Sequence, residues 1–290
     1  MTDKQAPMAE GDRLPWEPPA EPVPELPISA PETVPAPFSL APEPAAPAFP
    51  AWTIWDVAVI ACASVLSLLI CSSIAVGIAH RLPAYHGMSL GALTQEPRII
   101  IVSQIASYPL VIVLLASIVR RRSGEDFLTA IQWNWPGRSS LWFYLGGALL
   151  AFTVEGLAHF LPIPKSLPMD KFFTDVTSAY LMAFFGIAVA PVLEELFFRG
   201  MLYPTLRRAL GVGIGLILTA AAFAAIHGAQ LAYAWAPILS IFVVGFVLTV
   251  IRELTGSVAA SVLTHSGYNF TLFVALWIGS EHFHHLDKLN

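Results

Sequence analysis

Seven apolar segments, each close to the length that a helix needs to cross a bilayer, dominate this sequence. They lie at about 53–79, 99–119, 141–161, 177–198, 213–229, 235–251 and 257–279, and roughly 20 apolar residues in a helix span the hydrocarbon. No run of about ten residues with alternating polarity, as in a membrane β-barrel, accompanies them. Because helices satisfy every backbone group in lipid, we predict an all-α, polytopic transmembrane helix bundle with about seven spans.

The composition excludes the common soluble classes of protein. Hydrophobic residues make up 56% of the chain and charged residues only 12%, whereas a soluble domain carries about 25% charged residues. The chain also lacks the basic surface that nucleic-acid binding requires. We therefore expect the lipid bilayer as its surroundings and no nucleic-acid partner.

The first 51 residues form a separate compositional unit. They contain 14 of the 24 prolines, and they carry eight acidic residues against two basic ones. Proline fixes φ and removes a backbone donor, so we predict a disordered, acidic, proline-rich tail over 1–51. A passive leader is the favoured interpretation, and a docking sequence for a tail-binding partner is the alternative. The bundle then occupies 52–280, with the functional core at about 140–280 and a short tail at 281–290.

The distribution of Lys and Arg predicts the orientation. With seven spans, the loops on the amino-terminal side hold seven basic residues and those on the opposite side hold five. The cluster Arg120–Arg122 directly adjoins a span, where positive charge weighs most. We predict a multi-pass protein of a bacterial cell membrane, with its amino terminus in the cytoplasm.

Ionisable residues inside the apolar segments are the first functional candidates, because a charge at the bilayer centre costs about 2.5–3.5 kcal/mol even on the mildest scale. Glu195 and Arg199 are four residues apart, so they can pair on one helix face. Glu194 points about 100° away and needs a partner from another helix. Pro191, just upstream, can leave a backbone carbonyl free.

Two further segments offer polar groups. His227 follows Phe223 by four residues, and His265 and Asn269 have the same spacing on the last segment. A lone membrane histidine is more often an interhelical hydrogen-bond donor than a catalyst. Three helices that each offer such a group predict a shared polar pocket, which is costly to keep without a use.

The residue types in this pocket suit the activation of water. A buried glutamate, assisted by a histidine, can act as a general base, and a second histidine with an asparagine amide can stabilise an oxyanion. The chain lacks a His-Glu-x-x-His zinc helix, although two histidines and a glutamate leave zinc open as a ligand set.

The motifs Glu194-Glu195-x-x-x-Arg199, Phe223-x-x-x-His227 and His265-x-x-x-Asn269, in this order, resemble those of the CPBP family. These proteins are the Abi-type intramembrane endopeptidases related to the type II CAAX prenyl protease. The resemblance covers about 140–280 and implies a glutamate-dependent protease of a membrane-associated peptide or protein, with no cofactor. It implies that Glu194 is the general base assisted by His227, that His265 and Asn269 hold the oxyanion, and that Glu195 and Arg199 brace the site.

Two other functions remain open. A proton-coupled carrier would use Glu194, Glu155 and the histidines as a relay, and a non-catalytic scaffold or immunity factor would recruit a partner through its tail.

Several other features have a simpler structural interpretation. Glu155 and His159 are expected to form a local hydrogen-bonded pair, and the small-residue segment 213–229 is expected to pack inside the bundle. The histidines after the last span are expected to lie in a solvated tail, and four tryptophans are expected at the membrane interface. These two groups are His282, His284 and His285, and Trp52, Trp55, Trp133 and Trp135.

Overall fold

The computed structural model describes residues 49–164, 166–173 and 175–284, and every regular element in these ranges is helical. The predicted helix bundle is therefore confirmed, whereas the tail at 1–48 lies outside the described residues. The long helices match the seven predicted segments: α1 (Ile54–Ala79), α3 (Pro97–Ser123), α5 (Ser140–Ala158), the run α6 (Val176–Phe184), α7 (Ala190–Glu195) and α8 (Tyr203–Leu210), α9 (Val212–Ile226), α10 (Trp235–Thr255) and α11 (Val258–Gly279). Two short helices, α2 (Leu90–Leu93) and α4 (Phe127–Ala130), lie in the connections.

Within the described residues, five helical stretches are long and apolar enough to cross a membrane, fewer than the seven predicted. They are Ile54–Ala79, Pro97–Ser123, Gly137–Ala158, Val176–Leu210 and Trp235–Thr255. Helix α9 has only 15 residues and so reaches about 22 Å, less than the hydrocarbon thickness of about 30 Å. Helix α11 is long enough but carries the polar residues of the predicted site, which lower its hydropathy.

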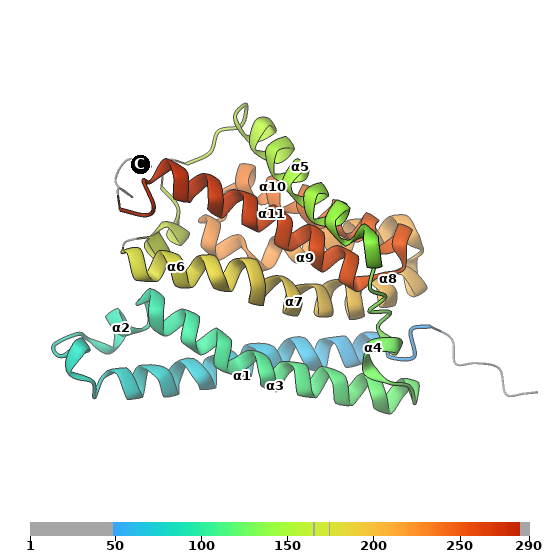
Figure 1. Cartoon of the computed structure of the whole chain (residues 1–290). Helices are drawn as coiled ribbons and strands as arrows, with labels where there is room; N and C mark the ends of the chain where they lie inside the picture. The colour runs from blue at the N-terminus through green and yellow to red at the C-terminus, as the bar shows by residue number, and fades with distance from the viewer. Residues whose placement is uncertain (1–48, 165, 174, 285–290) are drawn as a thin grey trace, which may run out of the picture. The chain divides into compact units, whose positions relative to one another are not determined.

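Helix α11 can carry polar residues because the bundle encloses it. Most of its first half is buried, including Thr264 and His265. Figure 1 shows α5 crossing α11, and the crossing has glycine on both helices. A Cβ atom at Gly147 would lie 2.6 Å from the backbone nitrogen of Tyr268, and one at Gly267 would lie 2.9 Å from the carbonyl carbon of Tyr144. Only glycine allows this approach of the two backbones.

Helix α9 does not lie inside the bundle, so that prediction is wrong. Its Ile214, Ile217 and Ile226 are exposed, while Gly215 and Ala220 are buried on the side that packs against α8 and α10. The buried face also holds Thr219 and the large Phe223, so the two faces differ little in hydropathy and not consistently in side-chain size. A lipid-facing surface and a packed surface are therefore equally apolar in the sequence.

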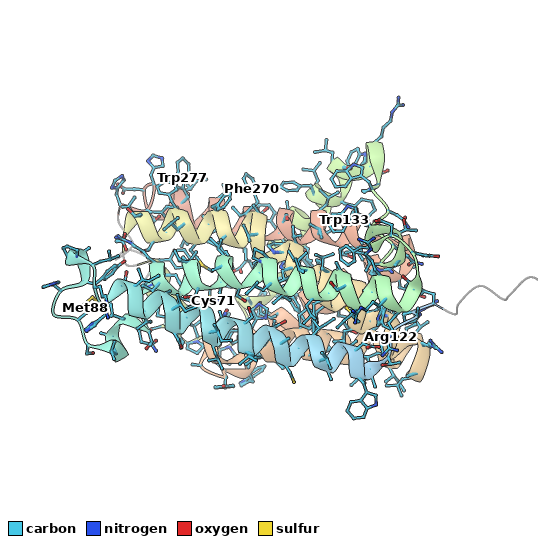
Figure 2. All side chains as sticks on the ribbon, turned by 90° about the horizontal axis from the view of Figure 1, so that it is seen from below. Cys71, Met88, Arg122, Trp133, Phe270 and Trp277 are labelled. Carbon is cyan, nitrogen blue, oxygen red and sulfur yellow. The ribbon has the colours of Figure 1, made fainter. Side chains whose placement is uncertain are left out.

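The amino-terminal end of α1 is fixed by specific polar contacts. Thr53 and Asp56 form a capping box, and the Arg122 side chain donates to Asp56 with an Nη2–Oδ1 distance of 2.8 Å. This joins the start of α1 to the end of α3, and Figure 2 shows Arg122 at that end of the pair and Met88 at the other. Trp52 is only 2% exposed and donates to the Met201 carbonyl, so its predicted place in an interfacial belt is wrong.

Candidate active site

The helical run from α6 to α8 contains two π-helical stretches, η4 (Phe185–Val189) and η5 (Leu196–Leu202). In η4 the Ala190 N–H donates to the Phe185 carbonyl, five residues back. The next bond in this pattern would join residue 191 to the Gly186 carbonyl, but Pro191 has no N–H. Asn269 Nδ2 donates to that carbonyl instead, at 2.6 Å. The free carbonyl expected from Pro191 thus positions a predicted site residue.

Glu195 and Arg199 form the predicted ion pair, and both side chains are 0% exposed. Arg199 Nη1 lies 2.7 Å from Glu195 Oε1. The guanidinium also donates to the Gly245 carbonyl at 2.6 Å and to Thr249 Oγ1 at 3.2 Å, both on α10. These bonds provide partners for the buried guanidinium and fix η5 against α10, whereas Glu195 Oε2 is buried without a hydrogen-bond partner among the described residues. The sequence motif alone gave no sign of Gly245 or Thr249.

His265 lies between the two adjacent glutamates. Its Nδ1 is 2.9 Å from Glu195 Oε1, and its Nε2 is 3.8 Å from Glu194 Oε2. Because a carboxylate accepts, Nδ1 carries a proton, so the neutral ring has its lone pair on Nε2, facing Glu194. The Glu195–His265 contact was not predicted, since nothing in either motif indicates that the two residues meet.

The ring of Phe223 lies between the two histidines of the site. Its centroid is 4.9 Å from that of His227 and 5.7 Å from that of His265, and it also lies 4.7 Å from the Arg199 guanidinium carbon. His227 Nδ1 donates to the Phe223 carbonyl at 2.8 Å. The Nε2 atom of the neutral His227 ring is therefore also an acceptor.

The two carboxylates differ in exposure. The Glu194 side chain is 19% exposed and that of Glu195 is fully buried. Water can therefore reach Glu194 more readily than Glu195.

Tyr108 on α3 is a neighbour of this site that the sequence did not predict. It lies within electrostatic range of Glu194, and its ring packs against that of Phe185 with a centroid distance of 5.6 Å.

The remaining candidates lie apart from this cluster. Glu155 on α5 and His159, the residue that follows the helix, are both exposed. In the part of the chain that the structure describes no hydrogen bond joins their side chains, so the predicted local pair is wrong. The His282 ring packs on Trp277 at 4.1 Å, and His285 lies outside the described residues. Over the described ranges, no three His, Cys, Asp or Glu side chains gather as a metal site would require. That the protein works without a metal cofactor stays a prediction.

The fold and this cluster define a class of protein. It is a helical integral membrane protein in which two carboxylates and a histidine contact one another inside the bundle, with a second histidine on the other side of a shared phenylalanine ring. A family model described as "Type II CAAX prenyl endopeptidase Rce1-like" matches residues 176–271. The resemblance predicted from the three motifs is thus confirmed over the stretch that contains them, which supports a CAAX-type intramembrane protease at the level of the family. Neither the curated proteins nor the solved structures gave a match.

Proposed function

We propose that this protein is an intramembrane endopeptidase that hydrolyses a peptide bond of a membrane-associated peptide or protein. The observation that carries the proposal is the pairing of Glu194 with His265 at 3.8 Å, beside the buried Glu195–Arg199 pair. That separation exceeds a direct hydrogen bond and is within reach of a bridging water. A partly exposed carboxylate next to an oriented imidazole is a suitable place to activate water.

In the proposed reaction, Glu194 takes a proton from water as the water oxygen bonds to the substrate carbonyl carbon. The proton then passes from Glu194 to the amide nitrogen as the C–N bond breaks, which leaves a carboxylic acid, an amine and the Glu194 carboxylate. His227 has an acceptor Nε2 that can hold the same water. The reaction uses no metal in this proposal.

The developing oxyanion needs hydrogen-bond donors. Asn269 uses one amide hydrogen on the Gly186 carbonyl and keeps a second. His265 Nε2 becomes a donor only when the ring carries a second proton, because the first is held by Glu195. The contact with Glu195 therefore keeps the first proton on Nδ1 of His265 and leaves Nε2 on the side of Glu194 and the substrate.

The orientation is part of the proposal. Arg122 reaches Asp56 at the start of α1, Arg208 reaches the Pro50 carbonyl, and Arg252 reaches Gln132 next to α4. Arginines from three helices thus gather at one end of the bundle. We infer that this end faces the cytoplasm of a bacterial cell, which labelling of Arg121→Cys in right-side-out and inverted vesicles would test.

The test is cleavage of a library of membrane-anchored peptides, with and without a prenyl group, by the purified protein in liposomes. Glu194→Gln, His227→Ala and His265→Ala are each expected to lower the rate by about 10²–10⁴-fold, the usual contribution of a general acid or base. Glu155→Gln is the matched control, because it neutralises an exposed carboxylate of a membrane helix outside the cluster. A parallel series with a chelator tests whether the cleavage requires a metal ion.

Full activity of Glu194→Gln would disprove the proposed base. Loss of activity with the chelator and its return with zinc would replace the proposed mechanism by metal-assisted hydrolysis. Transport driven by a pH gradient, without cleavage of any peptide, would favour the proton-coupled carrier.

A further inference from the structure

A polar cavity lies at the arginine-rich end of the bundle, separate from the candidate active site. It has a volume of about 220 Å³. It lies beside the last turn of α10 and the first turns of α8, and the residues that matter here are Gln132, Tyr203, Arg207, Arg252 and Glu253.

Arg252 is the unusual member of this set. It is only 4% exposed, and its hydrogen bonds go to neutral groups: Nε donates to the Arg199 carbonyl at 3.1 Å and Nη2 to Gln132 Oε1 at 2.6 Å. Over the described ranges, no carboxylate lies within ion-pair distance of its guanidinium. A buried charge without a counter-ion is costly.

The neighbouring carboxylate is already engaged. Glu253 accepts from Arg207 through both oxygens, at 2.9 Å and 3.1 Å, and from the Tyr203 hydroxyl at 2.8 Å. Two arginines and one glutamate therefore give the cavity wall a net charge of +1. A single negative charge in the cavity would balance it.

We propose that this cavity binds the phosphate group of an anionic membrane lipid. Helix α10 is long enough to cross the membrane, so its last turn lies near the level of the lipid headgroups. Guanidinium groups bind phosphate with several directed hydrogen bonds. A phosphodiester carries the single negative charge that the wall lacks, and the amide nitrogen of Gln132 supplies another donor.

The test is native mass spectrometry of the full chain in neutral detergent, titrated with phosphatidylglycerol or with diacylglycerol of the same acyl chains. Thermal unfolding with inorganic phosphate forms a second arm, which distinguishes a lipid headgroup from free phosphate. We expect the wild type to retain phosphatidylglycerol at least about tenfold more tightly than diacylglycerol, as expected for a charge-assisted contact.

Two variants with opposite effects make the test decisive. Arg252→Gln should weaken retention about tenfold relative to the matched control Arg121→Gln, which removes an exposed arginine at the same end. Glu253→Gln should strengthen retention several-fold relative to Glu125→Gln, because it raises the charge of the wall to +2. A folding defect can explain weaker binding, but it does not explain tighter binding.

The proposal is overturned if Glu253→Gln binds no more tightly than Glu125→Gln, or if folded Arg252→Gln binds as well as Arg121→Gln. Stabilisation by inorganic phosphate that depends on Arg252, without selective retention of phosphatidylglycerol, would support the phosphate site and overturn the lipid as its source.

Discussion

The close crossing of α5 and α11 gives a quantitative prediction, because two adjacent glycines on α5 have different surroundings. A Cβ atom at Gly147 would lie 2.6 Å from the Tyr268 nitrogen, and it would approach the Thr264 carbonyl oxygen more closely still, whereas one at Gly146 meets nothing within 4 Å. Normal contact distances are about 3.5–4.0 Å. Gly147→Ala therefore requires the two helices to separate by roughly 1 Å or more.

Overpacking of this kind costs about 1–3 kcal/mol, while alanine for glycine in a helix gains about 0.5–1 kcal/mol. We expect Gly147→Ala to lower the midpoint of thermal unfolding in detergent by about 4–8 °C, taking 2 kcal/mol and the usual conversion for a chain of this size. Gly146→Ala, the matched control, should leave the midpoint unchanged or raise it slightly.

The displacement also has a functional consequence, since α11 carries His265 and Asn269. In a cleavage assay Gly147→Ala should lose most of its activity even at temperatures where it stays folded. Equal unfolding midpoints for the two alanine variants would refute the reasoning. That result would mean that the backbones are not in contact at this crossing.

Three further predictions concern residues that fix the bundle. Trp52→Phe should destabilise the protein by about 0.5–1.5 kcal/mol in thermal unfolding, because it removes one of the two side-chain hydrogen bonds to the Met201 carbonyl and leaves the one from the Thr205 hydroxyl, whereas Trp55→Phe, at an exposed position, should change little. Burial would raise the pKa of the Asp175 carboxyl, but hydrogen bonds from its neighbours outweigh this and lower the pKa to about 2 from 3.8. Its stabilising contribution is therefore complete above about pH 4 and lost as the pH falls toward 2, and an acid titration of Asp175→Asn should lack this part of the loss. Glu195→Gln leaves the buried Arg199 without a counter-charge and should cost about 3–5 kcal/mol, so an unfolding free energy equal to that of the wild type would contradict the role of the ion pair.

The sequence predicts the parts of this structure that local periodicity determines. The long helices lie where their apolar segments predict, and the pairs Glu195–Arg199 and Phe223–His227 follow from spacing by four residues. Pro191 also predicts a free backbone carbonyl, but in an α-helix this would be the carbonyl of residue 187, and only the π-helical stretch moves it to Gly186.

Other parts depend on how helices cross, which no local pattern specifies. The Glu195–His265 contact joins residues 70 positions apart, and the burial of Trp52 depends on a carbonyl 149 positions away. The lipid-facing and packed sides of α9 are both apolar. Hydropathy therefore could not reveal which side faces the bundle.

The charges of the central cluster suggest why two adjacent glutamates can serve different purposes. Glu195 and Arg199 neutralise one another in full burial, so Glu194 contributes an unbalanced negative charge to an apolar interior. His265 contacts one carboxylate and faces the other, and a second proton on its ring would bring the whole cluster to zero net charge. With that proton on His265, Glu194 is an ionised base and Nε2 is a donor, which are the two states that the proposed hydrolysis needs together.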